Sequence, residues 1–541
     1  MRLLRSLKKI PIGLWEYLLL FAVSSLRFLY YGFTYFPQLD DYIQFYKYAQ
    51  MGDPAGLIER LGLLSARPLS GLADIFLWSK FWTCPWLMLL ILAALWAGSA
   101  FLFRRVFDRI FGCGSLFTAA CLLLPLGFEG TYWFSAATRI VCGMFFAALA
   151  MYFFLLHVRN GRKYALPLWV LCQLLAFGFY EPTLALSGAG ILLLMLREIY
   201  HGCRRGWWGM LTFANLLIYF AFTYFHSVGA LSNRVVTVLP WEEGYFTYFL
   251  PDLLHQMAAA FAKGGTLTFF RGAWRGLKII SADGGWWYLL LFAALAVGVA
   301  FLCLRADKKD RPADGKRWEA YLFAVIFTVA PLTPYLIVAN PWFSLRGTVP
   351  AFPGIALLLA LAAADLFRRR EMITPILTAV FVLVCGVASV SELHDYRATY
   401  ENDTAVLTAL TDELDGAEGR IGILNLNPNY LQEQNYFYHE HLHGVTESDW
   451  ALQGALFSCA EEVPKVIPLA TDGFSYYVGW NREMKRIGGF DTLYWWDNAA
   501  LTLTPLTAEG SDEAGWQLFA PDGSCVARVW EEEAYGYIEI N

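Results

Sequence analysis

The chain has 541 residues, of which 57% are hydrophobic, 17% aromatic and only 16% charged, and its mean hydropathy is +0.43. This composition excludes an ordinary soluble domain and indicates a polytopic membrane protein. The formal net charge of -5 is small for this length, and the basic residues lie in short clusters between apolar runs, so we expect no nucleic-acid partner.

Apolar runs long enough to cross a bilayer as helices occur about eleven times along the chain. The first run is too long for the core of a secretory signal peptide and lacks a small-residue cleavage site, so we expect it to be a retained anchor. We predict transmembrane helices at residues 12–36, 84–103, 110–127, 134–157, 164–180, 182–199, 207–228, 286–304, 318–338, 349–367 and 372–390.

Lys and Arg residues gather in every second loop between these runs, as they do in loops on the cytoplasmic side. The clusters are Arg104, Arg105 and Arg109; Arg159, Arg162 and Lys163; Arg197, Arg204 and Arg205; residues 305–317; and residues 368–370. This pattern predicts a cytoplasmic N-terminus and places the loops 37–83 and 229–285 outside, where both carry amphipathic segments. An odd number of spans also places the polar C-terminus outside. We therefore predict a transmembrane domain over residues 1–390 and an extracytoplasmic domain over residues 391–541.

Beyond residue 391 the composition is typical of a soluble α/β domain. A helix is predicted over Thr404 to Leu414, with Asn402 or Asp403 as its cap. Strands are predicted at residues 420–426, 463–470, 474–480, 501–506 and 525–530. Cys459 and Cys525 are the two cysteines of this tail, and an oxidising compartment can pair them, but the sequence does not supply the geometry of a disulfide.

Two adjacent carboxylates, Asp40 and Asp41, follow the first apolar run directly. A charge at the edge of a bilayer is paired, solvated or functional, so these are the first candidates for chemistry. The alternative is that they cap the helix that follows, because Asp at a helix N-terminus accepts hydrogen bonds from free N–H groups. Two carboxylates can also recruit a divalent cation, although two ligands are too few to name one.

The other ionisable residues near a predicted outer boundary are Arg67, Asp74, Glu129, Arg139, Glu181, Arg234 and Arg346. Carboxylates and arginines at one membrane surface suit the transfer of a group carried on a lipid phosphate, with a carboxylate as base and guanidinium groups on the phosphate. Each residue also has a structural interpretation. Arg67 and Arg346 can extend to lipid headgroups, Glu181 can stabilise a helix N-terminus, and Glu129 can be a solvated loop residue.

The sequence His439-Glu440-His441-Leu442-His443 resembles a metal-binding cluster. On a helix only His439 and His443 would share a face, so a structural or surface role is the favoured interpretation, and we predict no metal site. The chain has no G-x-S-x-G elbow, no P-loop and no H-E-x-x-H motif, which leaves serine hydrolases, nucleotide-driven proteins and zincins without support.

An acidic doublet in the first outer loop, surface helices after it, about ten or more spans and an outer C-terminal domain together resemble the GT-C class of membrane glycosyltransferases. Leu39-Asp40-Asp41-Tyr42, Arg67-Pro68-Leu69, and Glu129 with Tyr132-Trp133-Phe134-Ser135 look similar to bacterial O-antigen glucosyltransferase-like proteins. The resemblance covers the first half better than the tail.

The resemblance implies an inverting, hexosyltransferase-type enzyme of the bacterial plasma membrane that uses a polyprenyl-phosphate sugar and a cell-envelope glycan or lipid acceptor. It implies that Asp40 or Asp41 is the catalytic base. The substrate-binding candidates are Arg67, Glu129, Arg139, Glu181 and Arg346, and the resemblance assigns none of these arginines to the family's phosphate-binding position.

Two alternatives stay open. A cell-envelope polysaccharide polymerase or ligase would centre its chemistry on arginines of the long outer loop, here Arg234, Arg271 and Arg275. A transporter or flippase for lipid-linked sugars would show two repeats with paired interruptions and charges near the middle of the membrane, whereas this chain carries its charges at one boundary.

Overall fold

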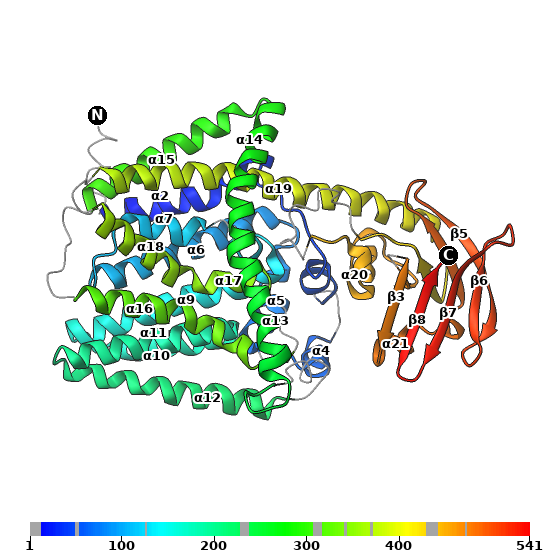
Figure 1. The fold of residues 1–541 in the computed structure, drawn as a ribbon, viewed down its shortest axis with the longest axis horizontal. Helices are drawn as coiled ribbons and strands as arrows, with labels where there is room; N and C mark the ends of the chain where they lie inside the picture. The colour runs from blue at the N-terminus through cyan, green and yellow to red at the C-terminus, as the bar shows by residue number, and fades with distance from the viewer. Residues whose placement is uncertain are drawn as a thin grey trace. The chain divides into compact units, whose positions relative to one another are not determined.

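The structure is a computed structural model that describes residues 12–48, 53–65, 67–124, 127–227, 237–306, 316–339, 343–367, 372–428, 442–470 and 473–541 (Figure 1). Its residues divide into two compact units. Among the described residues, those in 12–35 and 53–393 form the first, here called the helical unit, and those in 36–48, 394–428 and 442–541 form the second, here called the mixed unit. The segment that begins at Phe36 and carries Asp40 and Asp41 therefore groups with the tail, whereas we had expected it within the transmembrane domain 1–390.

The helical unit is built from apolar helices, and a helix accompanies each of the expected spans. Seven helical stretches in the described residues are long and apolar enough to cross a membrane, by length and composition. The protein is thus a polytopic α-helical membrane protein, as predicted. The helices are α2 (Ile12–Leu26), α6 (Pro85–Asp108), α7 (Gly114–Leu123), α9 (Phe134–Asn160), α10 (Ala165–Phe179), α11 (Glu181–Tyr200), α12 (Leu211–Phe225), α15 (Trp286–Ala306), α16 (Arg317–Val329), α18 (Phe352–Leu366) and α19 (Ile373–Glu413).

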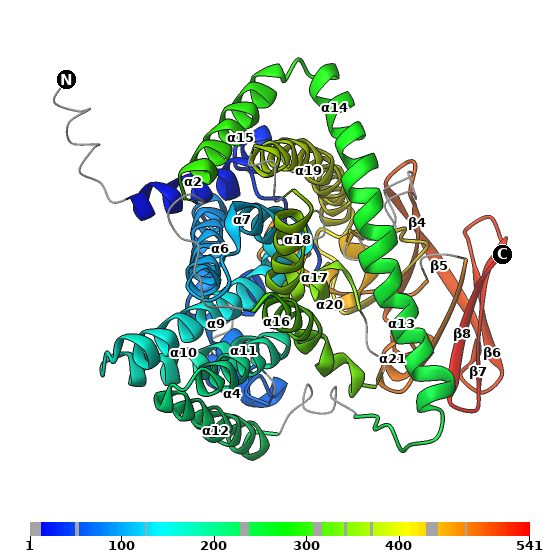
Figure 2. The ribbon, with the colours of Figure 1, turned by 60° about the vertical axis from the view of Figure 1, so that its left-hand side comes forward.

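Short helices connect these segments. They are α4 (Pro54–Leu61), α5 (Pro68–Phe76), η3 (Trp78–Phe81), α8 (Phe128–Thr131), η4 (Arg204–Met210), η9 (Ala330–Leu336), α17 (Leu345–Thr348) and η10 (Val349–Ala351). The long loop 229–285 is largely helical: η6 (Tyr245–Phe249), α13 (Leu250–Ala258), η7 (Ala259–Gly264), η8 (Leu267–Arg271) and α14 (Gly272–Ala282) follow one another (Figure 2).

The break between α10 and α11 positions one functional residue. Tyr180 has an extended backbone, and Pro182 occupies the first turn of α11, where its missing N–H costs nothing. Glu181 is therefore the first residue of α11, at the same end of the helical unit as the start of α9, because α10 connects the two in the opposite direction.

The mixed unit contains an eight-stranded sheet with the order β2-β1-β4-β5-β6-β7-β8-β3. The strands are β1 (Arg420–Leu424), β2 (Lys465–Pro468), β3 (Phe474–Val478), β4 (Thr492–Asp497), β5 (Thr502–Ser511), β6 (Gly515–Phe519), β7 (Cys525–Glu532) and β8 (Tyr535–Ile540). β1 pairs in parallel with β2 and β4, and α20 (Asp449–Cys459) lies between β1 and β2 in the chain, which makes a βαβ crossover. The remaining pairs are antiparallel. This confirms the C-terminal α/β domain.

Two boundaries differ from the predictions. The first helix ends at Leu26 instead of Phe36, because the chain turns there through Gly32 and Phe33, both with left-handed backbone. No separate helix begins at Asn402 or Asp403, since α19 continues through them as one helix of 41 residues. Asp403 is fully buried and accepts a hydrogen bond from the Val445 N–H at 2.8 Å, so it ties a neighbouring loop to the helix and does not cap it.

Candidate functional site

Arg67 and Glu181 form the first part of a polar cluster in the helical unit. Arg67 precedes Pro68 at the start of α5, and its Nε lies 2.9 and 2.8 Å from the two carboxylate oxygens of Glu181. Its guanidinium also lies over the Tyr180 ring, 4.9 Å from the centroid. Burial lowers the pKa of Arg67, but the charge and hydrogen bond of Glu181 together with Tyr180 and Tyr335 outweigh burial and raise the pKa overall. Arg67 is held as a cation and is about a third exposed.

Glu129 and Arg346 form the second part. Glu129 lies in α8 with only 1% of its side chain exposed, and it accepts hydrogen bonds from the Ser344 hydroxyl at 3.0 Å and the Arg346 N–H at 3.2 Å. The guanidinium of Arg346 is 3.7 Å from Glu129 and 5.2 Å from the centroid of the Trp133 ring, and a third of it is exposed. Glu129 therefore fixes the backbone from which Arg346 projects.

Arg139 and Asp74 form the third part. Arg139 lies in the second turn of α9, and its Nε donates to the Ser135 carbonyl oxygen at 2.5 Å. Asp74 of α5 is buried and accepts a hydrogen bond from the Thr138 hydroxyl at 3.1 Å. Burial raises the pKa of the Asp74 carboxyl to about 6, although the charge of Arg139 and the hydroxyls of Thr138 and Ser70 lower it. The Asp74 carboxyl therefore gains or loses its proton close to neutral pH.

These three parts make one site, here called the arginine cluster: Arg67, Arg139 and Arg346 with Asp74, Glu129 and Glu181. Arg139 interacts electrostatically with Arg67, with Arg346 and with Asp74. Tyr180 and Tyr335 connect the parts through a hydroxyl contact of 2.9 Å. The structure therefore brings together all five of the residues predicted to bind substrate. Three guanidinium groups that converge from α5, α9 and α17 suit a phosphate, which guanidinium forks bind through paired hydrogen bonds.

The aspartate doublet lies in the mixed unit, at the start of η2 (Tyr42–Lys47). Asp41 is fully buried, and its carboxylate accepts a hydrogen bond from the Gln38 N–H at 3.0 Å, which closes the turn before the helix. Asp40 is half-buried and accepts a hydrogen bond from the indole N–H of Trp450 at 3.0 Å. Leu39, which lies between Gln38 and Asp40, has a φ of 40° and therefore a left-handed backbone. This conformation is strained for a leucine, and strained residues cluster at functional sites.

The structure provides fewer contacts for the other predicted sites. Most of the histidine cluster, including His439 and His441, lies outside the described residues, as does Arg234. Among the residues that the structure describes, no three His, Cys, Asp or Glu side chains gather as a metal site would require. Cys459 and Cys525 are free thiols. In the long loop, Arg275 donates to the Ser391 hydroxyl at 3.3 Å.

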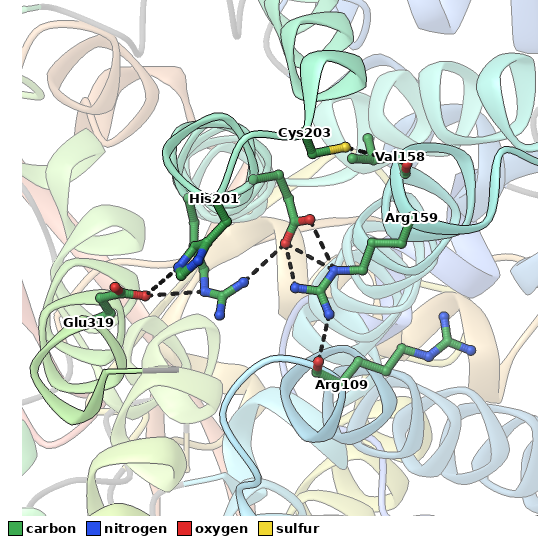
Figure 3. Close-up of polar contacts among 8 residues, drawn as sticks. Arg109, Val158, Arg159, His201, Cys203 and Glu319 are labelled. Carbon is green, nitrogen blue, oxygen red and sulfur yellow. Dashed lines mark hydrogen bonds and ion pairs between the residues drawn. The ribbon is translucent and has the colours of Figure 1, made fainter. Parts of the chain in front are cut away.

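A second polar cluster, the ion network of Figure 3, lies at the opposite ends of α9 and α11. Glu198 is 2.6 Å from Arg159 and 3.1 Å from Arg197, and Glu319 is 3.5 Å from Arg197 and 3.1 Å from His201. Its arginines belong to the clusters that we assigned to the cytoplasmic side. Because each carboxylate bridges two basic residues, the network joins α9, α11 and α16 and is best explained as a structural clamp.

The sequence alone did not single out Asp74 or the two tyrosines that connect the parts of the arginine cluster. Asp74 was one of several boundary carboxylates, and only burial beside Arg139 distinguishes it. Tyr180 and Tyr335 are 155 residues apart in the chain, so nothing local indicates that their hydroxyl groups meet.

Comparisons with known proteins give one likeness. No protein family model matches the sequence, and no curated protein matches it. The chain is similar to the crystal structure of ArnT from Cupriavidus metallidurans bound to undecaprenyl phosphate, with 13% sequence identity, 97% of each chain covered and a TM-score of 0.42. A likeness of this size does not assign the chain to a family.

Proposed function

We propose that this protein is an inverting glycosyltransferase that moves a sugar from a polyprenyl-phosphate donor to a glycan or lipid acceptor. The observation that carries the proposal is the arginine cluster, in which Arg139 lies within electrostatic range of both Arg67 and Arg346. Glu181 and Glu129 hold the guanidinium groups of Arg67 and Arg346 in place, and about a third of each of these two arginines is exposed, so both can also donate to an anion. A phosphate at the end of a membrane helix bundle, on a carrier whose chain lies in the bilayer, supplies that anion.

In the reaction, a hydroxyl oxygen of the acceptor attacks the anomeric carbon of the donor sugar. The bond from that carbon to the phosphate oxygen breaks, and the polyprenyl phosphate leaves with the bonding electrons. A carboxylate takes the proton of the attacking hydroxyl, and the arginine cluster stabilises the charge that develops on the departing phosphate. Single displacement inverts the anomeric centre.

The base is a carboxylate, and Asp40 is our first candidate. Asp41 is less suited because it is fully buried and closes its own turn, whereas Asp40 is partly accessible. Asp74 is the second candidate, because it belongs to the arginine cluster and its pKa of about 6 suits a general base near neutral pH.

The cellular setting is part of the proposal. The basic loops predict a cytoplasmic N-terminus with the mixed unit outside, and the resemblance to GT-C enzymes implies the bacterial plasma membrane, so that transfer takes place on the outer face. Reporter fusions at residue 310 and at the C-terminus test this orientation: a periplasmic phosphatase should be active only at the C-terminus, and activity only at residue 310 would reverse it.

The experiment that tests the function is transfer of labelled sugar by purified protein in lipid from a panel of polyprenyl-phosphate hexoses. We compare the parent with Asp40→Asn and Asp74→Asn, and use Glu401→Gln, at an exposed ion pair of α19, as the control. Loss of the base should lower transfer by roughly 100-fold or more. A folded parent that transfers no sugar from any donor would contradict the proposal, and full activity of both aspartate variants would exclude both as the base.

A further inference from the structure

The strands β7, β8 and β3 are neighbours in the sheet of the mixed unit (Figure 1). Aromatic side chains gather on one face of these three strands. Side chains alternate between the two faces of a strand. On one face Val529, Tyr477 and Ile538 enter the hydrophobic core. The opposite face carries Phe474, Tyr476, Trp530, Tyr535 and Tyr537, here called the aromatic platform.

The rings of the platform form one continuous surface around Tyr537. Its ring centroid is 5.3 Å from that of Trp530 with an angle of 16° between the rings, 6.1 Å from that of Phe474 and 6.3 Å from that of Tyr535. Tyr476 pairs with Tyr537 across the strands and is 67% exposed, and Phe474 is 47% exposed. Aromatic side chains gain most from burial, so a group of them left in water marks a binding surface.

The charges around the platform select its ligand. Gln517, Arg528, Glu532 and Glu539 are exposed on the same face of the sheet. Glu539 lies opposite Phe474, and Glu532 lies opposite Tyr535. These carboxylates would repel anionic lipid headgroups and nucleic acid. A rim with both charges and an amide complements a neutral ligand with many hydroxyl groups, which accept from Arg528 and donate to the carboxylates.

A sugar ring has this chemistry. Its C–H face is apolar and stacks on an aromatic ring, while its hydroxyl groups project from the edge toward polar neighbours. Three strands about 5 Å apart also offer several rings side by side, which suits a chain of sugars better than one.

We propose that the aromatic platform binds a neutral glycan chain. If the protein is the glycosyltransferase proposed above, that glycan is its acceptor, and this second statement rests on the proposed function. The platform then holds the acceptor chain by its sugar faces and leaves specificity for hydroxyl positions to the rim.

The test is binding of the full chain in nanodiscs to immobilised neutral polysaccharides (dextran, laminarin, mannan and galactan), measured without donor. Tyr476→Ala combined with Tyr535→Ala should lower the affinity for the retained polysaccharide by roughly tenfold or more, because two stacking faces are lost. Tyr476→Phe keeps the ring and should bind within about twofold of the parent. Tyr494→Ala, on β4, is the matched control and should leave binding unchanged.

Three results would contradict the proposal that the platform binds a neutral glycan. They are no retention on any of these polysaccharides, equal binding by the double variant, and retention only on phosphatidylglycerol vesicles that the double variant loses. The last would assign the surface to a membrane. If the protein binds a polysaccharide through the platform but transfers no sugar, the glycan-binding proposal stands and the glycosyltransferase proposal fails. If the protein transfers sugar but binds none of the polysaccharides, the glycosyltransferase proposal stands and the glycan-binding proposal fails.

Discussion

Arg67 and Glu181 are separated by 114 residues of sequence, yet the Arg67 Nε lies within 2.9 Å of both oxygens of the Glu181 carboxylate. The pair joins the start of α5 to the start of α11 and holds one guanidinium of the arginine cluster in place. Arg67 and Glu181 should therefore act on the donor as one unit.

Arg67→Ala should lower kcat/KM for the polyprenyl donor by roughly 10- to 100-fold, because a charge-assisted contact to the phosphate is lost. The double variant with Glu181→Gln should be no worse than Arg67→Ala alone, since Glu181 acts by positioning Arg67. Steady-state kinetics of the four proteins measure this coupling. Losses that simply add would show that the two residues act independently.

Asp74 should make stability depend on pH. Its pKa rises from the ordinary 3.8 to about 6 in the folded protein, so folding favours the protonated carboxyl. The stabilisation is complete below about pH 4 and is lost as the pH rises through 6, an effect on the order of 2–3 kcal/mol. Thermal unfolding in detergent between pH 4 and 7 should show the parent losing stability across this range, while Asp74→Asn should lack that step. Identical pH profiles of the two proteins would refute the assignment.

The ion network of Figure 3 should be sensitive to loss of its central carboxylate. Glu198→Gln leaves Arg159 and Arg197 without their shared anion, and Arg197 is nearly buried, so we expect a loss of roughly 3 kcal/mol or more. Glu401→Gln removes an exposed pair and should cost less than about 1 kcal/mol. Unfolding temperatures of the two variants make the comparison, and similar small shifts would argue against a clamp.

Gly276 should tolerate no side chain. A Cβ there would fall against the carbonyl oxygen of Val387 in α19, a backbone atom that cannot rotate away. Gly276→Ala should destabilise the protein by about 1–3 kcal/mol. Gly188 in α11 has nothing within 4 Å of the same position, so Gly188→Ala should be neutral or slightly stabilising. If both variants unfold alike, α14 does not pack against α19 this closely.

The sequence by itself determined the helical class, the positions of the membrane helices and the presence of a separate α/β tail. Each depends on local patterns, namely apolar runs, clusters of Arg and Lys, and alternation along strands. The same patterns predicted five of the eight strands and missed β4, β6 and β8. In β4 the buried residues Leu493 and Trp496 are three apart, which breaks the alternation.

Only the tertiary structure decided which ionisable residues meet. Arg67, Arg139 and Arg346 lie on different elements, and Asp74 is distinguished from other carboxylates only by burial beside Arg139. The aromatic platform likewise combines β3 with β7 and β8, which come some 50 residues later in the chain. Contacts between residues far apart in sequence depend on how the elements pack, and local periodicity carries no record of that packing.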